Sequence, residues 1–369
     1  HNDAFDQTTQ AAAPGVPNVL YAGAGGDEAT RSRTLEAIFK TPLMYEPGTK
    51  TLYSDVDYML LDFVIEKVTG KRLDVYLAET FWQPMGLSRI TYRPLDNCCG
   101  PGDCAATELN GNTRDGAVSF TGVRTYTLQG EVHDEKAYYA MGGISGHAGL
   151  FANASDLAVL ASAMLDGGYG NVRLFSRDVI DTFTAPKIES AANWGLGWWR
   201  EGDMARPWYF GTQSSSGTVG HQGWTGTLSM IDPAERLVVV YLTNKINSPV
   251  TDPAANPNQF DGNWYTASTL GFVAQLLYQG LKSRAGSPDA ALDALLADMT
   301  AEHFKLVASD GAVSAAHPRV QSAYAMLEVL VERGAQPFRF TARRYAEDAL
   351  NLLDPVRDAD ELAALREQL

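Results

Sequence analysis

The chain has 369 residues, of which 45% are hydrophobic and 20% are charged, as in a globular protein with a sizeable core. Its formal net charge is −15, and lysine and arginine form no cluster, so we do not expect a nucleic-acid partner. No run of 18 or more apolar residues occurs, and the sequence therefore predicts no membrane span.

Hydrophobic periodicity predicts five helices in the first three quarters of the chain. The clearest ends at Gly70 and carries an apolar face formed by Leu60, Leu61, Val64, Ile65 and Val68. In chain order the five helices are expected over about 31–40, 57–68, 73–80, 154–165 and 265–282.

Strand patterns follow residue 194. Residues 218–231, a turn at Asp232-Pro233-Ala234-Glu235 and residues 236–243 predict an antiparallel hairpin. The polar, glycine-rich stretch 107–149 is too long for a structureless connection, so we expect it to line a functional site.

A linker over residues 283–288 separates the two predicted domains, 1–282 and 283–369. Ser287 is an expected N-cap and Pro288 a first helical residue, and further helices are expected over about 318–332 and 341–353. The second domain is therefore predicted to be a helical C-terminal extension.

All three cysteines, Cys98, Cys99 and Cys104, lie in one short loop. A local disulfide with one thiol left over and three free thiols are both compatible with this spacing. A structural zinc site usually draws two separated pairs of ligands, and no second pair exists.

Two short motifs carry the chemistry. A tyrosine such as Tyr53, in Tyr53-Ser54-Asp55, can relay protons when a neighbouring cation lowers its pKa. The second motif is His221-Gln222-Gly223-Trp224-Thr225-Gly226-Thr227, where glycines let a substrate approach a strand and one strand N–H can enter an oxyanion hole. Each motif also has a structural interpretation, because Ser54 and Asp55 stand where a helix N-cap belongs and His221 can be an ordinary surface histidine.

Together, these motifs and their order resemble the family of class C β-lactamases and penicillin-binding proteins. The similarity covers roughly residues 31–282 and rests on five segments, 45–48, 53–55, 84–87, 141–151 and 221–227. The resemblance implies an α/β fold of the serine β-lactamase type, with an antiparallel sheet flanked by helices, a helical subdomain and a cleft between them.

The resemblance also implies roles for six residues. Those implied to be catalytic are Tyr53, His221 and Trp224, and those implied to bind substrate are Asp55, Gly223 and Thr225. Many relatives carry Asn where this chain has Asp55, and a carboxylate cannot donate a hydrogen bond unless it is protonated.

The family's nucleophile belongs to a Ser-x-x-Lys motif. No serine of this chain is followed by lysine three residues later. The resemblance places that motif about a hundred residues before the tyrosine motif, so we expect the nucleophile in an N-terminal segment that these residues do not include, with truncation or loss as alternatives.

The resemblance implies a serine hydrolase that acts through an acyl-enzyme on amide or ester bonds, without a cofactor and in the periplasm or outside the cell. Its expected partners are a small-molecule or peptidoglycan-peptide substrate and, as a further candidate, its own N-terminal fragment. Peptidoglycan D-Ala-D-Ala peptides, β-lactams and small esters remain alternative substrates, because fold and family do not choose among them.

Two other classes of function remain open. One is a catalytically inactive protein that binds cell-wall peptides. The other is a metal-dependent hydrolase that uses His133, Asp134, Glu135 and His147, residues that could instead form loop hydrogen bonds.

Overall fold

The computed structural model describes residues 28–50, 52–120, 122–187, 193–202, 206–211, 213–264 and 270–283. The chain divides into two compact units, one of His1–Trp199 with Val219–Phe260 and one of Arg200–Thr218 with Asp261–Leu369. Because residues 284–369 lie outside the described ranges, the helical extension and its boundary stay predictions.

Four helical elements begin the described chain, and they confirm the first three predicted helices. These are α2 (Glu28–Lys40), α3 (Asp55–Thr69), α4 (Leu73–Leu77) and η2 (Ala78–Trp82), which follows α4 without a break. In α3, Asp55 and Asp57 place negative charge in the first turn, where the helix dipole favours it. Gly70 ends the helix at φ 68°, and its N–H donates to the Glu66 carbonyl oxygen.

The buried face of α3 agrees only in part with the predicted one. Of the five predicted residues, Leu60 and Ile65 are half-buried against core clusters. The fully buried side chains of α3 are Val56, Met59 and Asp62, whereas the predicted face residues Leu61, Val64 and Val68 are exposed. On the buried side of the helix, Asp62 lies against the guanidinium of Arg31, 3.3 Å away. Val56 and Met59 instead pack in a core cluster with Ile38, Val118, Phe120, Tyr139, Ala140 and Met141.

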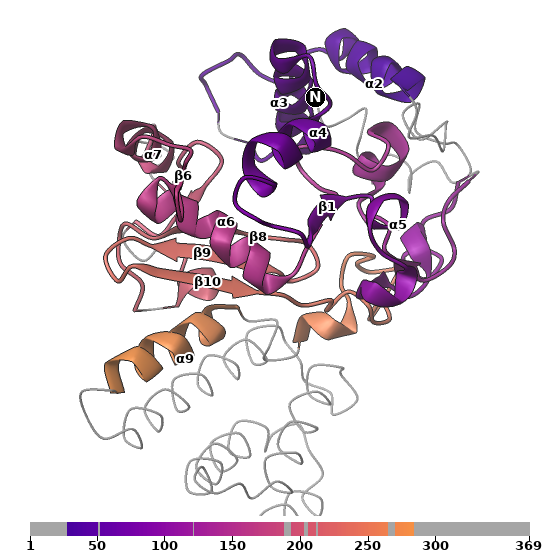
Figure 1. Ribbon diagram of the computed structural model, residues 1–369. Coiled ribbons are helices and arrows are strands. Elements are labelled where there is room, and N and C mark those ends of the chain that lie inside the picture. The colour runs from indigo at the N-terminus through magenta and orange to yellow at the C-terminus, as the bar shows by residue number, and fades with distance from the viewer. Residues whose placement is uncertain are drawn as a thin grey trace, which may run out of the picture. The chain divides into compact units, whose positions relative to one another are not determined.

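A four-stranded sheet of order β10-β9-β8-β7 lies beside α6 (Figure 1). Its strands are β7 (Trp199–Arg200), β8 (Val219–Gln222), β9 (Leu228–Asp232) and β10 (Leu237–Tyr241). The antiparallel β9–β10 pair confirms the predicted hairpin. The predicted strand 218–231 is wrong in its length, because a turn at 223–227 divides it into β8 and β9, which pair antiparallel.

Helix α6 (Ala154–Asp166) packs on the sheet through a small apolar cluster. Ala161 lies in this cluster with Val219 of β8 and Ile231 of β9. The helix begins where the Asn153 side chain accepts a hydrogen bond from the Asp156 N–H. The predicted helix over 154–165 is thus confirmed.

Three two-stranded ladders and several short helices complete the described elements. The antiparallel ladders join β1 (Ile90–Tyr92) to β4 (Leu150–Ala152), β2 (Ala106–Glu108) to β3 (Leu128–Gln129), and β5 (Gly168–Tyr169) to β6 (Val172–Arg173). The helices are α5 (Pro94–Asn97), η3 (Pro101–Asp103), η4 (Gly111–Thr113), η5 (Lys136–Ala140), α7 (Arg177–Thr184) and, in the second unit, α8 (Pro207–Phe210), η7 (Asp261–Trp264) and α9 (Leu270–Ser283). No described helix is long and apolar enough to cross a bilayer.

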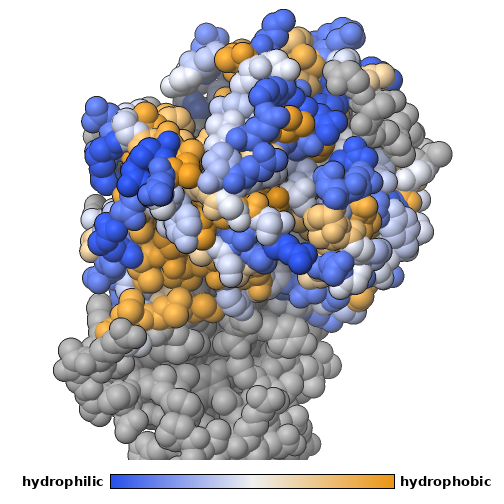
Figure 2. All heavy atoms as spheres, in the orientation of Figure 1, coloured by the Kyte–Doolittle hydropathy of each residue, from blue (hydrophilic) through white to orange (hydrophobic). Residues whose placement is uncertain are grey.

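This combination of helices with antiparallel sheets agrees with the α/β class expected from the sequence. Helix α9 corresponds to the predicted helix over 265–282, of which residues 265–269 are outside the described ranges. On the face drawn in Figure 2, hydrophobic residues gather on the lower left of the coloured surface, and hydrophilic residues cover much of the other coloured surface.

The polar stretch 107–149 folds around two buried arginines. The guanidinium of Arg114 forms ion pairs with Glu108 and Glu135, and the side chains of all three residues are almost fully buried. Arg124 donates to the Asn112 side chain and lies 3.7 Å from the centroid of the Tyr138 ring. Paired buried charges therefore organise a segment whose sequence has little hydrophobic periodicity.

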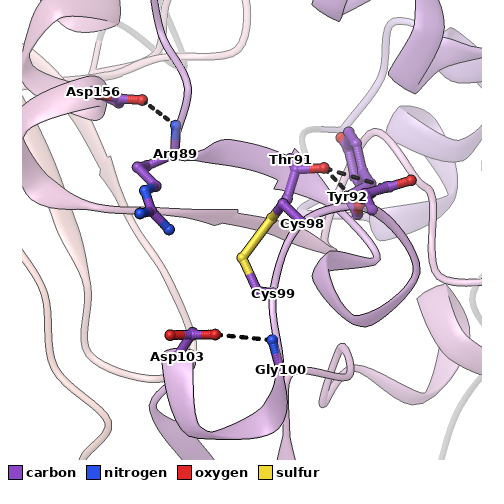
Figure 3. Close-up of a disulfide and its surroundings, with 9 residues drawn as sticks. Arg89, Thr91, Tyr92, Cys98, Cys99, Gly100, Asp103 and Asp156 are labelled. Atoms are coloured by element: carbon purple, nitrogen blue, oxygen red, sulfur yellow. Dashed lines mark hydrogen bonds between the residues drawn. A yellow bond between two sulfur atoms is a disulfide. The ribbon is translucent and has the colours of Figure 1, made fainter.

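A disulfide joins the adjacent residues Cys98 and Cys99 (Figure 3). Cys104 is a free thiol. Of the alternatives left open by the sequence, the structure shows the disulfide with one thiol left over. The bridge joins neighbours in the chain, so it closes no larger loop.

Candidate active site

The structure brings the two sequence motifs together at Tyr53 and His221. Their ring centroids are 6.2 Å apart with planes 30° apart, and the Tyr53 ring lies 6.3 Å from that of Trp194. Tyr53 precedes α3, next to Ser54, which has the extended conformation of an N-cap residue. Its side chain is 57% exposed, and its hydroxyl has no hydrogen-bond partner among the described residues.

His221 lies on β8, paired with Ser229 of β9. Its imidazole is 4.4 Å from the Trp199 ring, measured between centroids. The Nδ1 atom is 2.6 Å from the Gln222 carbonyl oxygen, which can only accept a hydrogen bond. Nδ1 therefore carries the proton of the neutral ring, and Nε2 is then an acceptor.

The turn after β8 is held by its own backbone. The Gly223 N–H donates to the Thr227 carbonyl oxygen at 2.8 Å, and the Gly226 N–H donates to that of Gly223 at 3.0 Å. Gly226 has φ +89°, and a Cβ there would lie 2.3 Å from the Thr243 Oγ1 atom. The turn thus requires glycine at 226 both for its backbone conformation and for lack of space.

Two of the predicted residues take different positions in this turn. Trp224 is 46% exposed, and its backbone N–H has no acceptor within the described part of the chain. Thr225 is buried, and its carbonyl oxygen accepts hydrogen bonds from the Thr243 hydroxyl at 2.6 Å and the Lys245 N–H at 3.1 Å. The Trp224 N–H is thus available to an external acceptor, whereas Thr225 anchors the turn.

Four ionisable groups form two ion pairs near Tyr53. The Lys136 Nζ atom is 2.9 Å from Asp55 Oδ2, and the His147 Nε2 atom is 2.9 Å from Asp134 Oδ1. The Nδ1 atom of His147 is 2.8 Å from the Ser145 hydroxyl. We refer to Asp55, Lys136, Asp134 and His147 as the charge cluster.

The charge cluster influences the protonation of Tyr53. Partial burial and the negative charge of Asp55 raise the pKa of Tyr53 to about 12, while Lys136 acts in the opposite direction. Burial lowers the pKa of Lys136, but the carboxylates of Asp55 and Asp134 outweigh it and raise the pKa overall. Tyr53 is therefore a neutral phenol and Lys136 a cation at neutral pH.

The second pair shifts the pKa values of both its members. Burial lowers the pKa of His147, but Asp134 outweighs it and raises the pKa overall. Burial would raise the pKa of Asp134, but His147 and Lys136 hold it below its ordinary value. Both shifts favour the charged forms of the two side chains.

The residues of the metal-dependent alternative divide between separate roles. Single ligand atoms of Asp55, Asp134 and His147 lie within 4.8 Å of one another, but Lys136 and His147 already pair with the two carboxylates. Glu135 is ion-paired with Arg114, and burial lowers the pKa of His133 to about 4. The carboxylates of Asp55, Asp134 and Glu135 are thus paired with Lys136, His147 and Arg114, so we do not propose a metal site.

The glycine-rich segment 141–151 holds His147 against α3. The Arg31 guanidinium donates to the carbonyl oxygens of Met141 at 2.9 Å and Ile144 at 2.7 Å. A Cβ on Gly146 would lie 2.4 Å from the Tyr58 carbonyl oxygen. Only glycine allows this close approach, which brings Ser145 and His147 beside the start of α3.

The sequence motifs did not single out Lys136, Trp194 or Trp199. Within the run 133–136, the sequence indicates a chemical role only for the candidate metal ligands His133, Asp134 and Glu135, and none for Lys136. The two tryptophans precede β8 in the chain. The sequence around an aromatic residue in such a position does not predict which surface its side chain will cover.

Comparison with known proteins shows the family. The Beta-lactamase family model matches residues 9–263. The chain is 49% identical over 272 residues to an Escherichia coli (strain K12) protein named as a D-alanyl-D-alanine carboxypeptidase, covering 73% of this chain and 62% of that protein. It is 47% identical over 253 residues to a Bacillus subtilis (strain 168) protein named N-acetylmuramyl-L-alanine amidase, covering 68% and 57% respectively.

The chain thus spans less than two thirds of the length of these relatives. A solved penicillin-binding protein homologue from Caulobacter crescentus is 19% identical with a TM-score of 0.42, covering 65% of this chain and 69% of that one. The chain belongs to the Beta-lactamase family.

Proposed function

We propose that the complete protein is a serine hydrolase that acts through an acyl-enzyme on amide or ester bonds. A serine oxygen would attack the carbonyl carbon, the serine proton would pass to the leaving group, and water would then hydrolyse the acyl-enzyme. Tyr53, His221 and Trp224 would be catalytic, and Asp55, Gly223 and Thr225 would contact or shape the site of the substrate.

One observation carries this proposal. The Tyr53 hydroxyl and the Trp224 backbone N–H have no partner within the described residues, and the ring of His221 lies beside that of Tyr53. A proton carrier and an oxyanion donor must both be available to a reacting group, and these two are.

The protonation of Tyr53 suggests the order of events. With a pKa of about 12, the phenol can donate a proton to a leaving group at neutral pH. Accepting the serine proton requires an additional cation that lowers this pKa. The lysine of a Ser-x-x-Lys motif would supply that cation, together with the nucleophile, from an N-terminal segment of the complete protein.

The exposed apolar residues of α3 support such a segment as a partner. Leu61, Val64 and Val68 are all at least half exposed, although a helix of a globular domain normally buries its apolar face. The N-terminal fragment would cover this face and bring its serine to the acyl site.

The relatives' names support a substrate class. One is named for carboxypeptidase action on D-alanyl-D-alanine and another for amidase action on N-acetylmuramyl-L-alanine. We propose an amide or ester substrate of the peptidoglycan type, which places the enzyme in the periplasm or outside the cell.

The test is acylation of the complete protein. Incubation with benzylpenicillin should add one penicilloyl group, detected by intact mass spectrometry, and replacing the serine of the Ser-x-x-Lys motif by alanine should abolish the addition. Binding without acylation would instead indicate a catalytically inactive peptide-binding protein. Hydrolysis that survives the serine substitution but stops with a chelator would contradict the proposed mechanism.

A further inference from the structure

The Lys136 ammonium lies beside the proposed acyl site with capacity to bind a ligand. Lys136 opens η5, and its Nζ atom is 2.9 Å from Asp55 Oδ2 at the start of α3. Asp55 in turn stands two residues after Tyr53 in the chain. The side chains of Lys136 and Asp55 are 18% and 24% exposed, so the pair is sheltered but reachable from solvent.

Most of the hydrogen-bonding capacity of this ammonium is unused. An ammonium group has three N–H donors, and Asp55 is its one acceptor among the described residues. Because the side chain is reachable from solvent, its remaining N–H groups can bond to water or to a ligand oxygen. A substrate oxygen that replaces such a water would be held by a charge-assisted hydrogen bond.

The charges around Lys136 indicate which kind of ligand oxygen its ammonium would bind. Lys136 pairs with Asp55, and His147 lies against Asp134, so each possible cation of the charge cluster already has a carboxylate beside it. The cluster therefore has no excess positive charge that would attract an anion. A neutral carbonyl oxygen, such as that of a peptide group, can accept from the remaining Lys136 N–H donors without bringing another charge into this sheltered position.

We propose that Lys136 is a substrate-recognition residue, whose ammonium, oriented by Asp55, donates a hydrogen bond to an amide carbonyl oxygen in the acyl part of the substrate. This inference rests on the proposed serine hydrolase function. Asp55 is then a positioning residue that acts through Lys136, and the pair gives the enzyme a preference for peptide-like acyl groups over hydrocarbon ones.

Two thioesters test this preference. One carries an N-acetyl-D-alanyl group and the other a 2-methylpentanoyl group, which has the same chain length with the amide replaced by two methylenes. The complete protein should have a higher kcat/KM for the amide-containing thioester, measured from the released thiol. In Lys136→Met, kcat/KM for that thioester should fall at least about tenfold more than for its hydrocarbon analogue, as expected on losing a charge-assisted hydrogen bond.

Two further variants separate recognition from folding. Lys136→Met leaves the Asp55 carboxylate unpaired, whereas the double variant Asp55→Ala/Lys136→Met removes both charges and should also lose the preference. Asp55→Asn/Lys136→Met is neutral too, but it provides an amide N–H donor and should recover part of the preference. Lys71→Met, which breaks the ion pair with Glu79 on the surface, is the matched control and should leave both rates unchanged.

The outcomes distinguish this inference from the function on which it rests. If the Lys136 variants lower kcat/KM equally for both thioesters, Lys136 has only a structural role and the inference is wrong, while the hydrolase function stands. If the wild-type protein hydrolyses both thioesters equally well, the inference also fails. If it hydrolyses neither, the proposed function fails, and the inference fails with it.

Discussion

The rings of Tyr53 and His221 lie 6.2 Å apart and within 30° of parallel, although the two residues come from distant parts of the chain. Tyr53 is held by the extended segment before α3, and His221 by the β8–β9 ladder. Two separate backbone elements thus bring together the two rings of the candidate site.

The Tyr53 hydroxyl should matter for activity and not for stability. Because it has no hydrogen-bond partner among the described residues, Tyr53→Phe should leave the melting temperature nearly unchanged. Loss of a proton relay should lower kcat of the complete protein by about 10²-fold or more. Tyr169→Phe makes the same change at another exposed tyrosine and should affect neither quantity. Wild-type kcat in Tyr53→Phe would remove Tyr53 from the mechanism.

Gly223 should be replaceable only when its neighbour is shortened. A Cβ at this position would lie 2.3 Å from the Thr227 Oγ1 atom, so Gly223→Ala should lower the free energy of unfolding by roughly 1–3 kcal/mol. In Gly223→Ala/Thr227→Ala the hydroxyl is gone and most of that loss should disappear. Urea denaturation measures both effects.

Activity of the same double variant tests the role of this strand edge. If substrate passes close to Gly223, the added methyl group should still reduce kcat/KM after stability has returned, whereas Thr227→Ala alone should reduce it much less. Full activity in the stable double variant would show that this edge is not part of the site.

The His147–Asp134 pair should make stability depend on pH with a definite sign. The pKa of His147 is raised above its ordinary value of 6.5, so its contribution is complete below about pH 6.5 and is lost as the pH rises through the raised value. The pKa of Asp134 is lowered from 3.8, so its contribution is present above about pH 3.8 and is lost as the pH falls through the lowered value. The window of greatest stabilisation lies between these limits.

His147→Gln should therefore cost roughly 1–3 kcal/mol of unfolding free energy at pH 5 and less at pH 9. His133 is the matched control, because its pKa is lowered to about 4. Its contribution to stability has the opposite slope, decreasing as the pH falls below about 6.5. Urea denaturation at pH 5, 7 and 9 measures both variants, and a cost of His147→Gln that does not change with pH would contradict the ion pair.

The number of cysteines that an alkylating reagent modifies should depend on whether the disulfide has been reduced. Cys98 and Cys99 are joined and Cys104 is free, so iodoacetamide should modify one cysteine in the unfolded, unreduced protein and three after reduction. The disulfide joins neighbouring residues and restricts the unfolded chain little. Cys98→Ser/Cys99→Ser should therefore change the unfolding free energy by less than about 0.5 kcal/mol. Intact mass spectrometry counts the modified cysteines. Three modified cysteines without reductant would contradict the disulfide between Cys98 and Cys99.

Much of the fold could be predicted from the sequence because its signals are local. The α3 and α6 helices carry their own stop or cap at Gly70 and Asn153, and such signals act within a few residues. The two motifs of the candidate site could be recognised for a similar reason, since each is a short run of residues. Family membership followed from their order along the chain.

The tertiary structure decided which residues face the site and which charges meet. Leu61, Val64 and Val68 form a regular apolar stripe, yet α3 buries Asp62, which pairs with Arg31 from another helix. In the same way, the sequence indicated that Asp55 cannot donate a hydrogen bond, and only folding brought the Lys136 ammonium to within 2.9 Å of it. Periodicity and motifs depend on a residue's neighbours along the chain, whereas the pairing of charges depends on contacts between distant segments. The sequence by itself therefore determined the family, and only the tertiary structure determined the electrostatics of the candidate site.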